Sequence, residues 1–134
     1  MKRTLALTAV TALVAGTPAL LAVAPAQAGG AERHARGTVA GARYDISAEK
    51  ERSGFEVDAD LDGVAAGSTW KMVVRHEGKR VATRKATARR DDGRFEVDFG
   101  SVRRPDTRGK DTFKVTLKRT NGAGKVTRKI TFPS

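Results

Sequence analysis

The segment 58–63, with the sequence DADLDG, carries carboxylates at a spacing that could bind a metal ion. Alternate carboxylates followed by glycine open a calcium-binding loop, in which the oxygens converge and the glycine makes a sharp turn. The twelfth position of such a loop holds a bidentate glutamate, whereas Thr69 stands there in this chain. The segment also continues an inside–outside alternation that begins at Phe55, so we expect a solvated strand face and no calcium site.

Paired carboxylates could also act as acid and base in glycoside hydrolysis, where they face each other about 5–10 Å apart across the substrate. Asp58 and Asp60 have a suitable spacing, but the alternation points both toward the same open face. No serine lies in a Gly-x-Ser-x-Gly context, and residues 109–111 (GKD) lack the rest of a phosphate-binding loop. We therefore expect no catalytic residue and no cofactor, and the chain is not predicted to be an enzyme.

The chain has two histidines and no cysteine. His34 lies in a polar N-terminal segment, and His76 lies next to Glu77 in a segment that favours a turn. Neither histidine has the ligand spacing of a transition-metal site. We expect His76 to be an ordinary turn residue and the chain to hold no metal ion.

The first 28 residues have the features of an export signal. Residues 1–4 supply positive charge, residues 5–24 are apolar with interruptions, and residues 26–28 (AQA) match the pattern that signal peptidase reads. We expect cleavage before Gly29 and a secreted product, either extracellular or associated with the cell wall. No hydrophobic segment follows Phe132, so no stable membrane insertion is expected after cleavage; an uncleaved anchor is the alternative.

Residues 29–134 form a basic chain of a length that suits one domain. Loss of Lys2 and Arg3 with the leader lowers the formal net charge from +11 to +9. Such an excess favours polyanions as partners, among them nucleic acid, anionic wall polymers and acidic lipid surfaces. The alternative is that the charge only keeps a small exported domain soluble.

Period-two alternation and glycine-containing turns at roughly ten-residue intervals predict an all-β domain over 42–134, with every aromatic side chain facing inward. Residues 29–41 have small and polar side chains without a period, and they are predicted to form a flexible arm. Residues 101–110 are predicted to form a long polar connection. Seven strands are expected, at about 42–48, 55–62, 69–75, 80–88, 95–99, 113–117 and 125–132.

Seven antiparallel strands in about 90 residues resemble an immunoglobulin-like or fibronectin type III-like sandwich. Trp70 stands in the third expected strand, where immunoglobulin-type domains bury a tryptophan. Residues 106–113 look like the turn into the sixth strand of those domains, although Phe113 replaces the tyrosine found there. The cysteine pair of those domains is absent, and apolar residues such as Val57 and Val115 are expected in its place.

A second resemblance covers the stretch from Trp70 through Gly78, residues 109–111 and the asparagine–glycine turn at 121–122. These segments are similar to small secreted immunoglobulin-like proteins of high-GC bacteria, whose activity is unassigned. The sandwich fold by itself implies no function.

A fibronectin-like connectivity would divide the strands into two sheets with outer faces of opposite charge. The first, second and fifth expected strands would form one sheet, and the other four would form the second. The outward positions of the first sheet would be acidic, at Glu56, Asp58, Asp60, Glu96 and Asp98. The outward positions of the second sheet include the candidate polyanion-binding residues Lys71, Arg75, Lys114, Lys118 and Lys129.

The sequence thus predicts a secreted, non-catalytic binding or structural module that contacts anionic polymers of the envelope through a basic sheet face. Because the aromatic side chains point inward, none is left for base stacking, and sequence-specific recognition of nucleic acid is not expected. The alternative hypothesis is an extracellular protein–protein interaction domain that uses a sheet edge or the 101–110 loop. The identity of the partner and the oligomeric state stay open at this point.

Overall fold

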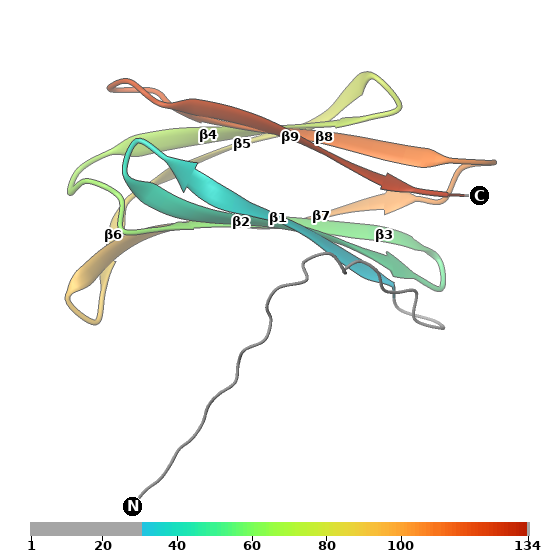
Figure 1. The fold of residues 1–134 in the computed structure, drawn as a ribbon, viewed down its shortest axis with the longest axis horizontal. Helices are drawn as coiled ribbons and strands as arrows, with labels where there is room; N and C mark the ends of the chain where they lie inside the picture. The colour runs from blue at the N-terminus through green and yellow to red at the C-terminus, as the bar shows by residue number, and fades with distance from the viewer. Residues whose placement is uncertain (1–30, 134) are drawn as a thin grey trace, which may run out of the picture.

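Two antiparallel sheets lie face to face in the computed structural model of the chain, which describes residues 31–133 (Figure 1). The five-stranded sheet has the order β1-β2-β3-β7-β6, and the four-stranded sheet has the order β5-β4-β8-β9. The described residues contain no helix with the length and apolar character needed to cross a membrane. The strands are β1 (Glu32–Val39), β2 (Ala42–Glu51), β3 (Gly54–Asp62), β4 (Thr69–His76), β5 (Lys79–Thr87), β6 (Arg89–Asp91), β7 (Arg94–Pro105), β8 (Asp111–Arg119) and β9 (Lys125–Phe132).

The core lies between the two sheets, as the period-two alternation predicts. β3 alternates between buried apolar side chains, from Phe55 to Leu61, and carboxylates on the outer face. From the facing sheet, β4 buries Trp70 and alternate residues after it. Trp70 is only 1% exposed, and its indole Nε1 donates a hydrogen bond of 3.0 Å to Ser68 Oγ. The all-β, two-layer architecture is therefore confirmed.

The structure has nine strands, so the expected number of seven is wrong. β1 lies within residues 29–41, where a flexible arm was expected, and it pairs with β2 along its whole length. β6 is a three-residue strand that pairs with the start of β7. The other seven strands correspond to the expected ones and are divided between the sheets as expected. The predicted leader, residues 1–28, lies outside the described residues.

β7 is longer than expected because the chain stays in the sheet beyond Gly100. This glycine has a φ of 74°, and the pairing between β3 and β7 shifts its register between Asp58 and Asp60. Beyond the shift, residues 101–105 pair with residues 54–58. Glycine adopts this left-handed backbone without steric cost, which lets the strand bend and continue. The predicted 101–110 connection is corrected to residues 106–110.

Two arginines close the open sides of the sandwich. Arg84 of β5 donates hydrogen bonds to the carbonyl oxygens of Phe99 (3.3 Å) and Ser101 (3.1 Å), both on β7. On the other side, Arg128 of β9 donates a hydrogen bond to the Tyr44 hydroxyl oxygen of β2 (2.5 Å). β5 and β9 are the edge strands of the four-stranded sheet. Each arginine therefore links an edge of that sheet to the facing sheet.

The turn between β4 and β5 has an unusual backbone. Glu77 and Gly78 both have positive φ, 53° and 83°, as in the two-residue turns that match the twist of antiparallel strands. For glutamate this left-handed conformation costs about 1–2 kcal/mol. The Glu77 backbone N–H donates a hydrogen bond of 3.0 Å to the Thr112 carbonyl oxygen, which fixes the turn against β8.

Candidate functional site

The outer face of the four-stranded sheet carries two parallel rows of cations. Strand register places Lys85, Lys71, Lys118 and Lys125 side by side on β5, β4, β8 and β9, and we call these four residues the lysine row. The same register places Arg75, Lys114 and Lys129 side by side on β4, β8 and β9, and we call these three the mixed row. Together the two rows form the cationic face.

A strip without charge separates the two rows. Thr83, Val73, Thr116 and Thr127 are aligned on the same four strands, and the hydroxyl oxygens of Thr116 and Thr127 are 2.9 Å apart. A depression of about 240 Å³ lies over this strip. Neighbouring strands are about 5 Å apart, and four residues along a strand span about 13 Å. The face therefore presents cations at about 5 Å intervals in two rows that are about 13 Å apart.

The cationic face carries charge that the protein itself does not neutralise. The four strands of its sheet contain twelve lysines and arginines and a single carboxylate, the buried Asp111. Among residues 31–133, none of the seven cations of the two rows lies within 4.0 Å of a carboxylate oxygen. Unneutralised cations on a common face create a positive potential that attracts polyanions.

The five candidate residues predicted from the sequence all lie on this face. Lys71 and Arg75 are half-buried, whereas Lys114, Lys118 and Lys129 are exposed. The sequence reasoning missed Lys85 and Lys125. Lys125 is the first residue of β9, and its even spacing from Lys129 was a signal that could have placed it on the same face. Lys85 lies in a strand without clear alternation, and only its pairing with Lys71 places it in the lysine row.

The outer face of the five-stranded sheet is mixed in charge, so the expectation of a purely acidic face is corrected. Its carboxylates are interleaved with arginines from neighbouring strands. Asp62 accepts from both Arg43 (3.0 Å) and Arg94 (3.2 Å). Arg103 forms ion pairs of 2.9 Å and 3.0 Å with Glu51 and Glu56. Only the basic half of the predicted charge asymmetry is therefore found.

Asp60 is the carboxylate of this mixed face with the most repulsive surroundings. Asp45 and Asp98 lie directly opposite it on the two neighbouring strands. Partial burial raises the pKa of Asp60, and the nearby carboxylates of Asp45, Asp98, Glu96 and Asp62 raise it further. By contrast, the pKa of Asp45 is lowered: burial opposes its ionisation, but hydrogen bonds from His34 and Arg36 outweigh that cost.

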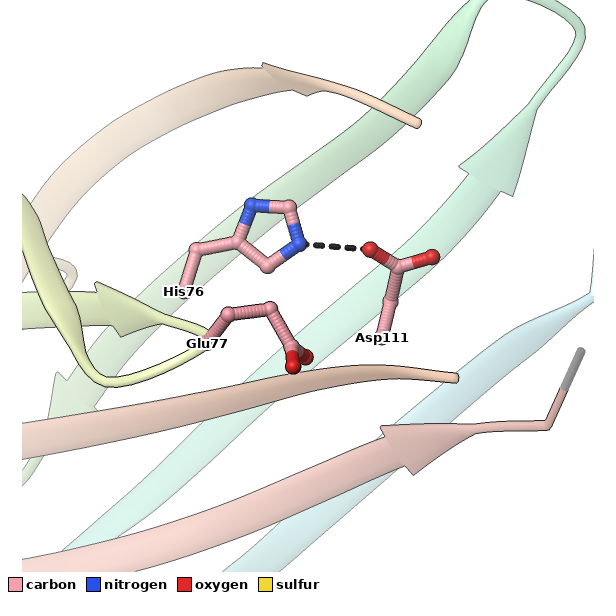
Figure 2. A group of neighbouring side chains, drawn as sticks. All are labelled: His76, Glu77 and Asp111. Carbon is pink, nitrogen blue, oxygen red and sulfur yellow. Dashed lines mark hydrogen bonds and ion pairs between the residues drawn. The ribbon is translucent and has the colours of Figure 1, made fainter. Parts of the chain in front are cut away.

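A second cluster of ionisable groups lies at the end of β4, where His76, Glu77 and Asp111 converge (Figure 2). The expectation that His76 is an ordinary turn residue is wrong. His76 is the last residue of β4, is 4% exposed, and its Nε2 lies 2.7 Å from Oδ1 of the buried Asp111. The alternation of Trp70, Met72 and Val74 continues inward to position 76, and this was the signal that could have placed His76 in the core.

Asp111 is stabilised in its ionised form. Burial alone would raise the pKa of Asp111, but hydrogen bonds from the Thr107 hydroxyl and from His76 hold it below its usual value. An ionised carboxylate can only accept hydrogen bonds, so His76 Nε2 carries the hydrogen that it shares with Asp111.

The segment 58–63, considered above as a calcium loop, forms the end of β3 and the start of the connection to β4. Asp58 accepts a hydrogen bond of 2.6 Å from the Ser101 hydroxyl, and Asp62 is held by arginines. The three carboxylates are spread along one strand face, in agreement with the strand interpretation. Comparison of the chain with protein-family models, with curated proteins and with solved structures finds no match.

Proposed function

We propose that the protein is a secreted, non-catalytic module that binds anionic polymers of the cell envelope through the cationic face. The observation that carries this proposal is the pair of cation rows on one sheet face without an internal carboxylate partner among the described residues. A polymer with a charged group every few ångströms could contact several lysines of one row at once. Such binding releases counterions and does not depend on base sequence.

Two further parts of the proposal rest on the sequence and the strand order. The leader-like residues 1–28 support export, which would bring the cationic face into contact with envelope polymers. The strand order, with β2, β3 and β7 in one sheet and β5, β4, β8 and β9 in the other, supports an immunoglobulin-like arrangement of fibronectin type III kind, extended by β1 and β6. The fold by itself does not select a binding surface, so the proposal rests on the cationic face.

The test measures binding of residues 29–134 to a random-sequence DNA duplex across a salt series. The duplex serves as a phosphate polymer whose salt response per contact is known, about 0.9 in log–log slope. The variant K71Q/K118Q/K125Q removes three cations of the lysine row. We expect the slope to decrease by about three and retention on heparin to shift to lower salt.

The matched control is R52Q/R89Q/R90Q, which removes the same charge from the β2–β3 turn and from β6 of the other sheet. Its slope should stay close to that of the unmodified protein. Equal losses in the two variants would show that net charge alone drives retention. Absence of any salt-dependent retention would refute polyanion binding.

A further inference from the structure

We propose that His76, Glu77 and Asp111 form a binding site for a divalent transition-metal ion, for which Zn²⁺ is the best fit. The site lies between the β4–β5 turn and the start of β8, and the side chains of His76 and Asp111 are in the core. It is independent of the cationic face, so the inference goes beyond the proposed function.

The three side chains offer donor atoms that already converge. One ligand atom from each of His76, Glu77 and Asp111 lies within 4.8 Å of the other two. Figure 2 shows the His76 imidazole facing the Asp111 carboxylate, with the Glu77 side chain lying beside this pair. His76 and Asp111 are buried, whereas Glu77 is exposed, so the cluster is closed on the core side and open on the solvent side. An ion would therefore approach from the side of Glu77.

The surroundings hold the donors in place, as the outer partners of metal ligands do. The His76 ring stacks on Phe113, with ring centroids 4.3 Å apart and an interplanar angle of 14°. The Thr107 hydroxyl donates a hydrogen bond to Asp111, and the Thr112 backbone N–H donates one to the Glu77 carboxylate. Each of the three donors is thus oriented by a neighbour that is not itself a ligand.

The donor set selects the class of ion. One imidazole nitrogen with two carboxylates suits Zn²⁺ and similar ions, and three protein ligands leave a fourth, tetrahedral position for water. Ca²⁺ and Mg²⁺ prefer all-oxygen sites with more ligands. Two ligand atoms on a tetrahedral Zn²⁺ are about 3.3 Å apart, so His76 Nε2 and Asp111 Oδ1, now 2.7 Å apart, need to separate by about 0.6 Å.

Metal binding requires a change in the protonation of His76. In the metal-free protein Nε2 carries the hydrogen shared with Asp111; the metal takes the Nε2 lone pair. A neutral imidazole then keeps its single hydrogen on Nδ1, and an imidazolium releases one proton to solvent. The carboxylates bind as anions and change no proton.

The position of these groups in the core supports a role beyond packing. Ser68, His76 and Asp111 are the buried polar residues among residues 31–133, and Ser68 is explained by its hydrogen bond with Trp70. A buried charged or hydrogen-bonded pair is often replaceable by apolar residues without loss of stability. Next to the pair, Glu77 keeps a left-handed backbone that disfavours glutamate. A bound cation would give a role both to the buried His76–Asp111 pair and to the left-handed backbone at Glu77.

The experiment is a calorimetric titration of residues 29–134 with ZnCl₂, with the unmodified protein and Glu77→Gln compared. The amide introduced by this substitution keeps an oxygen acceptor for the Thr112 N–H, so the turn and the core should fold as before. We expect one Zn²⁺ per chain and at least a tenfold weaker affinity in the variant. The ring nitrogens of His76, followed by NMR, should change from a protonated to a metal-bound Nε2 on addition of Zn²⁺.

The matched control is His34→Gln, which removes the other histidine, whose Nδ1 lies 2.9 Å from Asp45 on the surface of the opposite sheet. This variant should bind Zn²⁺ as the unmodified protein does. Saturable binding that is lost with His34→Gln but kept with Glu77→Gln would overturn the proposal. So would an absence of stoichiometric binding, or a His76 ring whose NMR signals do not respond to Zn²⁺.

Discussion

At the scale of single residues, Asp60 experiences electrostatic repulsion from other carboxylates on the outer face of the five-stranded sheet. Its pKa is raised by burial and by four neighbouring carboxylates. A raised pKa means that the folded state holds the proton more tightly than the unfolded chain does. The usual pKa of an aspartate is 3.8. As the pH rises from this value through the higher pKa of the folded state, ionisation of Asp60 therefore lowers the stability of the fold.

We expect Asp60→Asn to stabilise the protein at neutral pH by about 0.5 kcal/mol, a value discounted for solvent screening because the carboxylate is only partly withdrawn from water. Well below pH 3.8 the carboxyl group is protonated in both states, and the difference should vanish. Urea denaturation across a pH series measures it. A destabilisation at neutral pH, or a gain that persists in acid, would contradict this account.

Gly37 on β1 has no side chain, and the Tyr44 ring occupies the space that a side chain would fill. A Cβ atom at this position would lie 2.6 Å from the Tyr44 hydroxyl oxygen and 2.9 Å from the ring. Gly37 and Tyr44 are directly paired across β1 and β2. The close approach lets the tyrosine reach Arg128, which closes that side of the sandwich.

We expect Gly37→Ala to destabilise the fold by about 1–3 kcal/mol, because the tyrosine ring must move and its hydrogen bond to Arg128 is lost. Combined with Tyr44→Phe, the cost of the alanine should be smaller, since the closest atom is then removed. Thermal unfolding of the two single variants and the double variant measures this coupling. Strict additivity would show that the contact is not the cause.

At the scale of elements, Arg84 and Arg128 link the two sheets, and we expect each of them to stabilise the fold. Arg84 bonds carbonyl oxygens along an edge of β7 that the short β6 does not cover, since β6 pairs only with residues 94–96. We expect Arg84→Met to cost about 1–2 kcal/mol. Arg80→Met, on the same strand, should change stability by less than about 0.5 kcal/mol.

Arg128→Met should add independently to Arg84→Met, because the two arginines lie on opposite sides of the sandwich. Chemical denaturation of the two single variants and the double variant measures the sum. A strong coupling between the two positions would mean that the sheets shift as a unit when either side is opened.

The strands that the sequence analysis found are those whose inward residues are large. Phe55, Trp70 and Phe113 mark their strands because alternation of bulky apolar and polar residues is a strong signal. β1 escaped detection because its buried residues are mainly small, with Ala35 as an example, and its stability comes from pairing with β2.

The remaining differences arise from contacts that are distant in the sequence. Residues 101–105 were expected in a loop because they contain serine, arginines and Pro105, but they join the sheet by pairing with residues 54–58. His76 was expected in a turn because its partner Asp111 is 35 residues away. Alternation placed the five candidate cations on one face, whereas membership of Lys85 in the lysine row depends on strand register, which the sequence does not encode locally.

At the scale of the whole molecule, the cationic face opposes folding as well as favouring polyanions. Seven cations in two rows repel one another across distances shorter than the Debye length at low ionic strength. We expect the melting temperature to rise between about 0.01 M and about 0.5 M salt. The variant K71Q/K118Q/K125Q should melt higher at low salt and respond less to added salt, as differential scanning calorimetry would show.

The sheet order also divides the strand pairings into those that are local in the sequence and those that are distant. β1, β2 and β3 are consecutive neighbours, as are β4 with β5 and β8 with β9, so these meanders and hairpins close over short loops. The pairing of β3 with β7 joins Gly54 to Pro105, and that of β4 with β8 joins His76 to Phe113. Such distant partners make the search for the native state slow compared with that of helical bundles. Until β7 pairs with β3, the edge of β3 that β7 covers in the native sheet stays available to the strands of other chains. The chain is therefore most exposed to aggregation in the interval after its synthesis.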